Sequence, residues 1–178
     1  VEKSAKGRAY IESGERENFH KRYKCRIRSP WYAVPSVYAT EVGMLKRSHD
    51  TPRLILNRAG AYTTDTAYRI RALRGTAAAL VYGFYNGLTA LSAELEGRHY
   101  GGGVLELVPS EIEKLLLPDV QTIQPKVETL DRMVREDTVA DTLEVQSEDV
   151  LGALTMSEQM DLLSAWATLR DRRHRLPA

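Results

Sequence analysis

Residues 64–95 read TDTAYRIRALRGTAAALVYGFYNGLTALSAEL, and the hydrophobic period changes within this stretch. From 64 to 73 apolar and polar residues alternate, which predicts a strand that carries Arg69 and Arg71 on one face. From 76 to 95 large apolar residues recur every three or four positions, which predicts one helix. A strand and a helix in direct succession, within a chain of mixed pattern, indicate an α+β fold.

The region upstream of this stretch is rich in short strand patterns. Residues 23–28 alternate and predict a strand with a basic face, residues 34–45 contain a second short strand, and residues 53–57 form a third. Residues 1–20 are polar and without clear period, so we expect a linker from a preceding domain there. Because the chain starts at Val1 and not at methionine, we also expect that upstream sequence is missing.

The region downstream is mostly helical. Three glycines, Gly101–Gly103, precede a strand at 104–107, and Ser110 with Glu113 forms a capping-box pattern for a short helix that ends at Pro118. We predict two longer helices, one over 126–136 and one that begins at a second capping box, Thr155 with Glu158, and ends in a cluster of arginines. Gly83 and Gly87 lower helix propensity in 76–95, which indicates a close backbone approach there.

These patterns predict three regions. A linker covers 1–20, a mixed β-sheet domain with packed helices covers 21–118, and a helical C-terminal region covers 119–178. The fold class is therefore α+β.

Composition excludes several classes of protein. The single cysteine, Cys25, rules out a disulfide framework and a thiolate metal cluster, and is compatible with a cytoplasmic location. The four histidines lack the spacing of ligands on one helix face, so we predict no metal site. No apolar run approaches the length of a membrane span, and we expect no membrane partner.

Charge is divided unevenly along the chain. Residues 1–75 carry 16 Lys/Arg against 7 Asp/Glu, whereas residues 76–178 carry 9 against 17. A basic half suggests a surface that faces a polyanion such as nucleic acid, although such segregation also arises for solubility alone.

Two motifs superficially suggest a catalytic or cofactor site. Residues 29–32, Ser-Pro-Trp-Tyr, resemble the Ser/Asn/Asp-Pro-Pro-aromatic loop of amino-methylating DNA enzymes, but a tryptophan replaces the second proline, so we interpret them as a turn with a packed Trp31. The glycines at 101–103 precede a strand, whereas a dinucleotide-type cofactor loop follows one, so we expect a tight turn with positive φ. We predict no catalytic residue and no cofactor in this chain.

Four segments in order carry a family resemblance: 23–32, 52–61, 64–71 and 94–111. Together they resemble the C-terminal target-recognition region of adenine-specific DNA methyltransferases from bacterial restriction–modification systems, over about residues 20–118. A weaker similarity, through Asn86-Gly87, the glycine-rich strand and Leu117-Pro118, joins the chain to specificity subunits of type I restriction enzymes.

The resemblance implies double-stranded DNA as partner and an upstream catalytic domain that binds S-adenosylmethionine. It also implies a chain that reads DNA without catalysing the reaction. From strand faces and turn chemistry we expect DNA contacts from ten residues: Lys24, Arg26, Arg28, Asn57, Arg58, Tyr62, Thr63, Thr64, Arg69 and Arg71.

One of these residues, Asn57, also suits a turn-capping role. Outside this set, Trp31 suits the core, and Arg98 is expected to satisfy carbonyls near the glycine turn. Two other functions remain open for the chain: a stand-alone nucleic-acid adaptor, and a protein–protein module whose acidic helical region docks a partner subunit.

Overall fold

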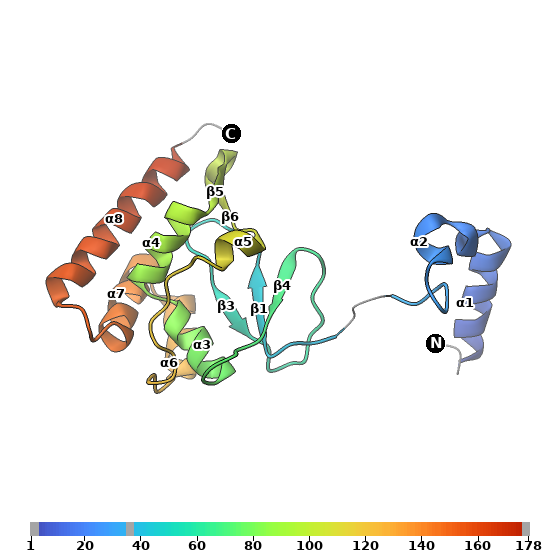
Figure 1. Cartoon of the computed structure of the whole chain (residues 1–178), viewed down its shortest axis with the longest axis horizontal. Coiled ribbons are helices and arrows are strands. Elements are labelled where there is room, and N and C mark those ends of the chain that lie inside the picture. Colours follow the sequence, from blue (N-terminus) through green and yellow to red (C-terminus); the bar gives the residue numbers. More distant parts are fainter. Residues whose placement is uncertain (1–3, 35–37, 176–178) are drawn as a thin grey trace. The chain divides into compact units, whose positions relative to one another are not determined.

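The computed structural model describes residues 4–34 and 38–175. The chain divides into two compact units at the boundary between residues 37 and 38. Figure 1 shows the elements of each unit. The first unit contains α1 (Ala5–Arg16), η1 (Phe19–Lys21) and α2 (Tyr23–Arg26). The strands of the second unit are β1 (Val42–Leu45), β2 (Arg47–Ser48), β3 (Leu54–Leu56), β4 (Ala67–Ile70), β5 (Arg98–Tyr100) and β6 (Val104–Glu106). Its helices are α3 (Ala77–Phe84), α4 (Gly87–Glu96), η2 (Gly101–Gly103), α5 (Pro109–Ile112), α6 (Val127–Glu136), α7 (Val139–Val150) and α8 (Met156–His174).

The N-terminal unit is helical, which corrects two predictions. The expected linker over 1–20 contains α1, and the expected strand over 23–28 is the short helix α2 followed by a turn. The guanidinium of Arg26 lies 5.5 Å from the ring of Tyr23, three residues earlier, a spacing that one helical turn brings together. A six-residue alternation is too short to exclude that geometry.

Trp31 packs inside the N-terminal unit, as expected for the turn at 29–32. A Cβ added to the buried Gly14 of α1 would lie 2.6 Å from Trp31 Cη2, so the indole rests directly on the helix backbone. The indole Nε1 donates to Glu15 Oε1 at 3.1 Å. The interpretation of Trp31 as a packed residue is confirmed.

In the second unit, β1 is the middle strand of an antiparallel sheet with the order β3-β1-β4, and the expected strands at 53–57 and 64–73 are confirmed as β3 and β4. Alternate residues of this sheet face a buried core together with side chains of α3, α4 and the segment that contains α5. The core-facing residues of the sheet are Val42, Met44, Leu54, Leu56, Tyr68 and Ile70.

A second antiparallel sheet has the order β2-β6-β5, and the strand predicted at 104–107 is confirmed as β6. The three glycines before it form η2, in which Gly102 and Gly103 have φ of 73° and 75°. The predicted tight turn with positive φ is therefore confirmed. The described part of the chain therefore has two antiparallel sheets instead of the expected single mixed sheet. The predicted α+β class is confirmed.

The helix predicted over 76–95 is two helices, α3 and α4, that break at Tyr85-Asn86. Asn86 is fully buried and caps α4: its Oδ1 accepts from Thr89 N at 3.0 Å and its Nδ2 donates to Gly83 O at 2.6 Å. The chain changes direction at this cap. The prediction missed the break because apolar residues recur every three or four positions on both sides of it. The expected close approach is confirmed, because a Cβ on Gly83 would lie 2.6 Å from Ile123 and one on Gly87 2.9 Å from Leu163.

The helix caps match the expectations in part. Thr155 and Glu158 form the predicted capping box at the start of α8. The cap predicted at Ser110 is wrong: α5 begins at Pro109, and Glu111 accepts the backbone N–H of Val108 at 2.8 Å. Proline at the first helical position shifts the start, because it needs no hydrogen-bond acceptor there.

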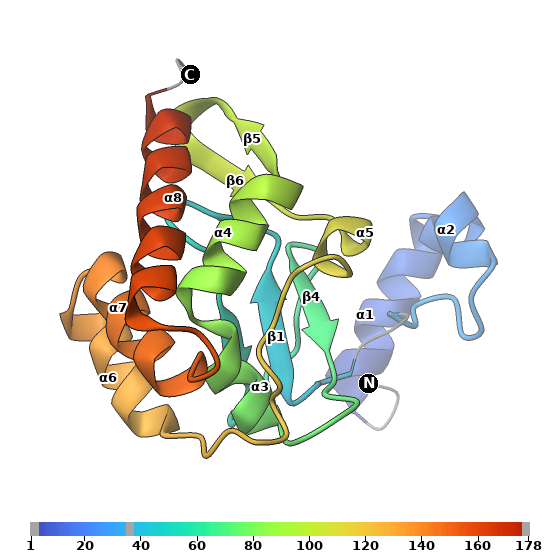
Figure 2. The same cartoon turned by 60° about the vertical axis from the view of Figure 1, so that its left-hand side comes forward.

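The C-terminal helices α6, α7 and α8 belong to the same compact unit as the sheets. A second core cluster joins Tyr82 and Tyr85 of the α3 region to Leu143 of α7 and Trp166 of α8, and Figure 2 shows α8 running beside α4. The boundary expected between 118 and 119 therefore lies inside one packed unit, although the region after it is helical as predicted. Among the described residues, no helix has the length and apolar character that crossing a membrane requires.

Candidate nucleic-acid interface

The face of the β3-β1-β4 sheet opposite the core carries a mixed apolar and basic surface, here called the outer sheet face. It consists of Gly43, Leu45, Ile55, Ala67 and Arg69, which alternate with the core residues. Leu45 and Ile55 are 52% and 51% exposed, so apolar side chains on this face lie in contact with solvent.

Arginines flank the outer sheet face along the edge formed by β4. The guanidinium of Arg69 stacks 4.1 Å from the ring of Tyr38, and Arg71 follows β4 with an exposed side chain. Stacking on an aromatic ring orients the guanidinium, which keeps its positive charge. Both residues are among the expected DNA contacts, and both lie at one sheet edge.

A groove of about 970 Å³ runs along β3, the other edge strand. Leu45 and Ile55 line it, so the groove is continuous with the outer sheet face. Its charged lining consists of Arg47, Arg53, Arg58 and Arg135 against Asp50, Glu128 and Asp131. Arg53 was not predicted, because it stands alone at the start of the β3 pattern, without a motif around it.

Arg58 forms an ion pair with Glu128, and both residues line this groove. Its Nη2 donates to Glu128 Oε1 of α6 at 2.7 Å, and the two side chains are 64% and 75% exposed. The same hydrogen bond lowers the pKa of Glu128. An exposed pair of this kind contributes at most about 1 kcal/mol to stability and exchanges readily with other partners.

Asn57 is a turn residue, as its structural alternative proposed. Its Nδ2 donates to Thr40 O at 2.8 Å and to Ala61 O at 2.9 Å, and its Oδ1 accepts from Ala61 N at 2.9 Å. Both ends of the amide are therefore engaged in holding the loop that follows β3. The base-edge contact that we expected from Asn57 would require these bonds to break.

The rest of this loop divides into exposed and inward residues. Tyr62 is 67% exposed, and the hydroxyls of Thr64 and Thr66 lie 2.8 Å apart. The hydroxyl of Thr63 is buried and has no hydrogen-bond partner in the described part of the chain. The structure thus gathers five predicted residues on one loop, and Arg58 and Tyr62 are both largely exposed there.

The remaining predicted residues lie in the N-terminal unit. Lys24 and Arg26 belong to α2, and Arg28 follows it and donates to Ala33 O at 3.2 Å. Residues 18–28 contain five Lys/Arg and no Asp or Glu. In place of the expected strand with a basic face, these residues lie on and next to two short helices. They are called here the basic cluster and consist of Lys21, Arg22, Lys24, Arg26 and Arg28.

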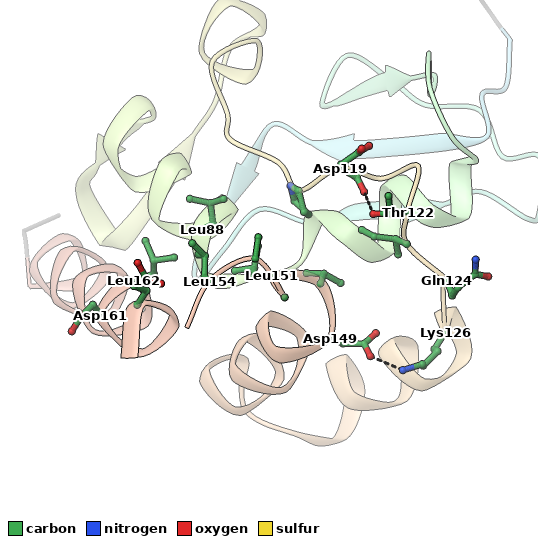
Figure 3. A pocket seen from close by; sticks show the side chains of 16 residues that line it. Leu88, Asp119, Thr122, Gln124, Lys126, Asp149, Leu151, Leu154, Asp161 and Leu162 are labelled. Atoms are coloured by element: carbon green, nitrogen blue, oxygen red, sulfur yellow. Dashed lines mark hydrogen bonds and ion pairs between the residues drawn. The ribbon is translucent and has the colours of Figure 1, made fainter. Parts of the chain in front are cut away.

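The C-terminal helices present a different surface, a cleft of about 930 Å³ between α4, the loop before α6, and α8. Figure 3 shows Leu88, Leu151, Leu154 and Leu162 around it, with carboxylates at its margin. The lining contains four carboxylates, Asp119, Asp149, Glu158 and Asp161, and one cation, Lys126. Apolar walls and a net negative rim repel a nucleic-acid backbone.

Asp149 anchors the α6 side of this acidic cleft. It accepts from Lys126 Nζ and from the Tyr82 hydroxyl, each at 2.6 Å, and these two bonds lower its pKa. Burial, followed by the bond to Asp149, raises the pKa of Tyr82 to about 12, so this phenol remains a donor throughout the physiological range.

Arg98 forms a contact different from the expected one. Its Nε lies 2.7 Å from Glu111 Oε1, so it links β5 to α5 rather than to the glycine turn. The Gly103 carbonyl is instead bonded by Arg173 of α8. The pairing of residues 70 positions apart leaves no local signal in the sequence.

Comparison with known proteins places the chain in a family. No curated protein and no solved structure matches it. A family model described as Type II methyltransferase M.Eco57I, C-terminal domain, matches residues 1–151. The match covers both compact units up to the end of α7. The chain therefore belongs to the family of the C-terminal domain of the Type II methyltransferase M.Eco57I.

Proposed function

We propose that this chain is the DNA target-recognition part of an adenine-specific methyltransferase of a restriction–modification system. It holds a duplex while a separate catalytic domain binds S-adenosylmethionine and methylates a flipped adenine. The observation that carries the proposal is the outer sheet face, on which Leu45 and Ile55 are exposed. This face is continuous with an arginine-lined groove and bordered by Arg69 and Arg71. The family match supports the methyltransferase context of this surface.

Each of the two units, taken separately, has residues whose chemistry suits a duplex. Arginine and lysine bind phosphates and set the register of the protein on DNA, and the predicted contacts Lys24, Arg26 and Arg28 serve this role from the basic cluster of the N-terminal unit. Side chains at a loop tip reach base edges, and Arg58 and Tyr62 occupy that position after β3. Asn57, Thr63 and Thr64 shape the loop.

Paired substitutions at Ile55 test the outer sheet face. Ile55 is 51% exposed, so Ile55→Lys and Ile55→Glu each place a flexible, unbranched side chain on the face, with opposite charge. We expect the glutamate variant to bind a short labelled duplex on the order of tenfold more weakly than the lysine variant, because like charges at an interface repel. Fluorescence anisotropy at several salt concentrations measures this, with a slope of about −0.9 per phosphate contact. Equal affinities of the two variants would show that the outer sheet face does not contact the DNA.

A second function is favoured by the acidic cleft of Figure 3. Its leucine walls and carboxylate rim suit an apolar, basic segment of the catalytic domain, which agrees with a protein–protein role for the helical region. Leu154→Asp should prevent co-purification with the separately expressed catalytic domain, whereas Leu116→Asp, at an exposed leucine outside the cleft lining, should not. Co-purification that survives Leu154→Asp would exclude this docking site.

A further inference from the structure

The end of α8 brings His174 next to the adjacent residues His49 and Asp50 of the loop after β2. One potential donor atom from each of His49, Asp50 and His174 lies within 4.8 Å of the others. The two imidazole rings are 4.3 Å apart, and His49 Nδ1 is 4.0 Å from Asp50 Oδ2. No spacing of histidines in the sequence predicts this cluster, because 125 positions separate its two rings.

From this geometry we infer a binding site for a divalent transition-metal cation, with Zn²⁺ as the representative ion. Two imidazole nitrogens and one carboxylate form a donor set that suits Zn²⁺, Co²⁺ or Ni²⁺, whereas Mg²⁺ and Ca²⁺ require oxygen donors. Three protein ligands leave a further position for water. This inference does not depend on DNA binding.

The backbone around the cluster is held in place before any ion arrives. Arg173 donates to the carbonyls of His49 at 2.6 Å and Asp50 at 3.0 Å, which fixes the main chain of both ligands. The charge of Arg173 is paired with Glu94, whose carboxylate is completely buried, so this arginine does not carry an uncompensated charge towards the cation. The carbonyl end of α8 also favours a positive charge.

The ligand side chains retain the freedom to close on an ion. His49 and Asp50 have side-chain exposures of 64% and 44%. Around tetrahedral Zn²⁺, with bonds of about 2.0 Å, neighbouring donor atoms lie about 3.3 Å apart, so closure requires shifts of roughly 1 Å. His174 Nε2 lies 2.9 Å from the His49 carbonyl, the kind of outer contact that orients a metal-binding imidazole.

Calorimetric titration of the untagged chain with ZnCl₂ tests the site. We expect one Zn²⁺ per chain with a dissociation constant in the micromolar range, and at least tenfold weaker binding for His49→Gln, Asp50→Asn and His174→Gln. His20→Gln, in the other compact unit, is the matched control and should bind as the wild type does. Co²⁺ in place of Zn²⁺ should give visible d–d bands that disappear in the same three variants.

Two of these variants distinguish a loss of metal binding from a loss of folding. His49→Gln and Asp50→Asn change exposed side chains, so circular dichroism should show that they fold as the wild type does without metal. Millimolar or weaker Zn²⁺ binding by the wild type would overturn the inference. So would binding that is unchanged in folded His49→Gln and Asp50→Asn.

Discussion

Arg173 of α8 and Glu94 of α4 form a two-pronged ion pair in which both side chains are completely buried. Arg173 Nη2 lies 2.6 Å from Glu94 Oε1, and Nε lies 3.0 Å from Oε2. The same guanidinium also donates to carbonyls of His49, Asp50 and Gly103. One side chain therefore joins the last turn of α8 to α4, to the loop after β2 and to η2.

Removing the arginine should be strongly destabilising. Arg173→Met removes the cation that pairs with the buried Glu94 carboxylate and the donor to the carbonyls of Asp50 and Gly103, and we expect a loss of about 3–5 kcal/mol in the free energy of unfolding. Arg172→Met, at the exposed neighbouring position, should change stability by less than about 0.5 kcal/mol. Urea denaturation measures both. Similar midpoints for the two variants would show that the buried pair contributes little.

The break between α3 and α4 depends on Asn86. Asn86→Ala removes a helix cap and leaves the Gly83 carbonyl and the Thr89 N–H without their partner in a buried site. We expect a cost of about 2–3 kcal/mol, since the cap contributes about 1 kcal/mol and unsatisfied buried groups add to it. Thr155→Ala, which removes an exposed cap of α8, should cost only about 1 kcal/mol. Equal losses would mean that burial of Asn86 adds nothing.

The N-terminal unit depends on the contact between Trp31 and Gly14. Gly14→Ala places a methyl group 2.6 Å from Trp31 Cη2, and overpacking of this kind costs about 1–3 kcal/mol. Trypsin should therefore cleave faster at the basic residues of α2, measured by mass spectrometry of the early fragments. Gly152→Ala, where a Cβ meets no atom within 4 Å, is the control and should leave the cleavage rate unchanged. Slow cleavage in Gly14→Ala would show that the indole moves aside without cost.

Acid should weaken the α6–α7 region through Asp149. Its folded pKa lies below the ordinary value, 3.8, so it stabilises the fold above that pH and the contribution is lost as pH falls through the folded pKa. Between pH 6 and pH 3 the wild type should lose on the order of 1 kcal/mol more than Asp149→Asn, since the pair with Lys126 is partly exposed. Denaturation series at both pH values compare the two proteins. Parallel losses would show that other carboxylates carry the acid sensitivity.

The sequence predicted those elements whose evidence is local and missed those made by distant contacts. β3, β4 and β6 follow from clear alternation and turn residues, and the start of α8 follows from Thr155 and Glu158. The strand predicted over 23–28 is wrong because the same short run of basic and aromatic residues is equally compatible with a helix. Asn86 carried a recognisable capping signal, but the uninterrupted apolar period on both sides concealed it.

The candidate site shows the same division. Arg69 and Arg71 share one sheet edge because a predicted strand positions them, and a predicted turn positions the loop after β3. The partners of Arg58 and Arg173, at Glu128 and Glu94, come from elements 70 and 79 positions away. Such pairings arise only from tertiary packing, as does the cluster of His49 and His174.

The ion pair between Arg58 and Glu128 provides a sharp test of the DNA surface. An arginine held by a carboxylate at 2.7 Å must leave it to bind DNA, so Glu128 competes with the nucleic acid for Arg58. Glu128→Gln should therefore raise affinity for a labelled duplex more than Glu144→Gln, which removes the same charge from an exposed position on α7. The difference should be severalfold, and it should disappear when Arg58→Ala is added to both variants. Anisotropy titrations of the four proteins at one salt concentration decide the matter: equal gains for Glu128→Gln and Glu144→Gln would reflect net charge alone and place Arg58 outside the interface.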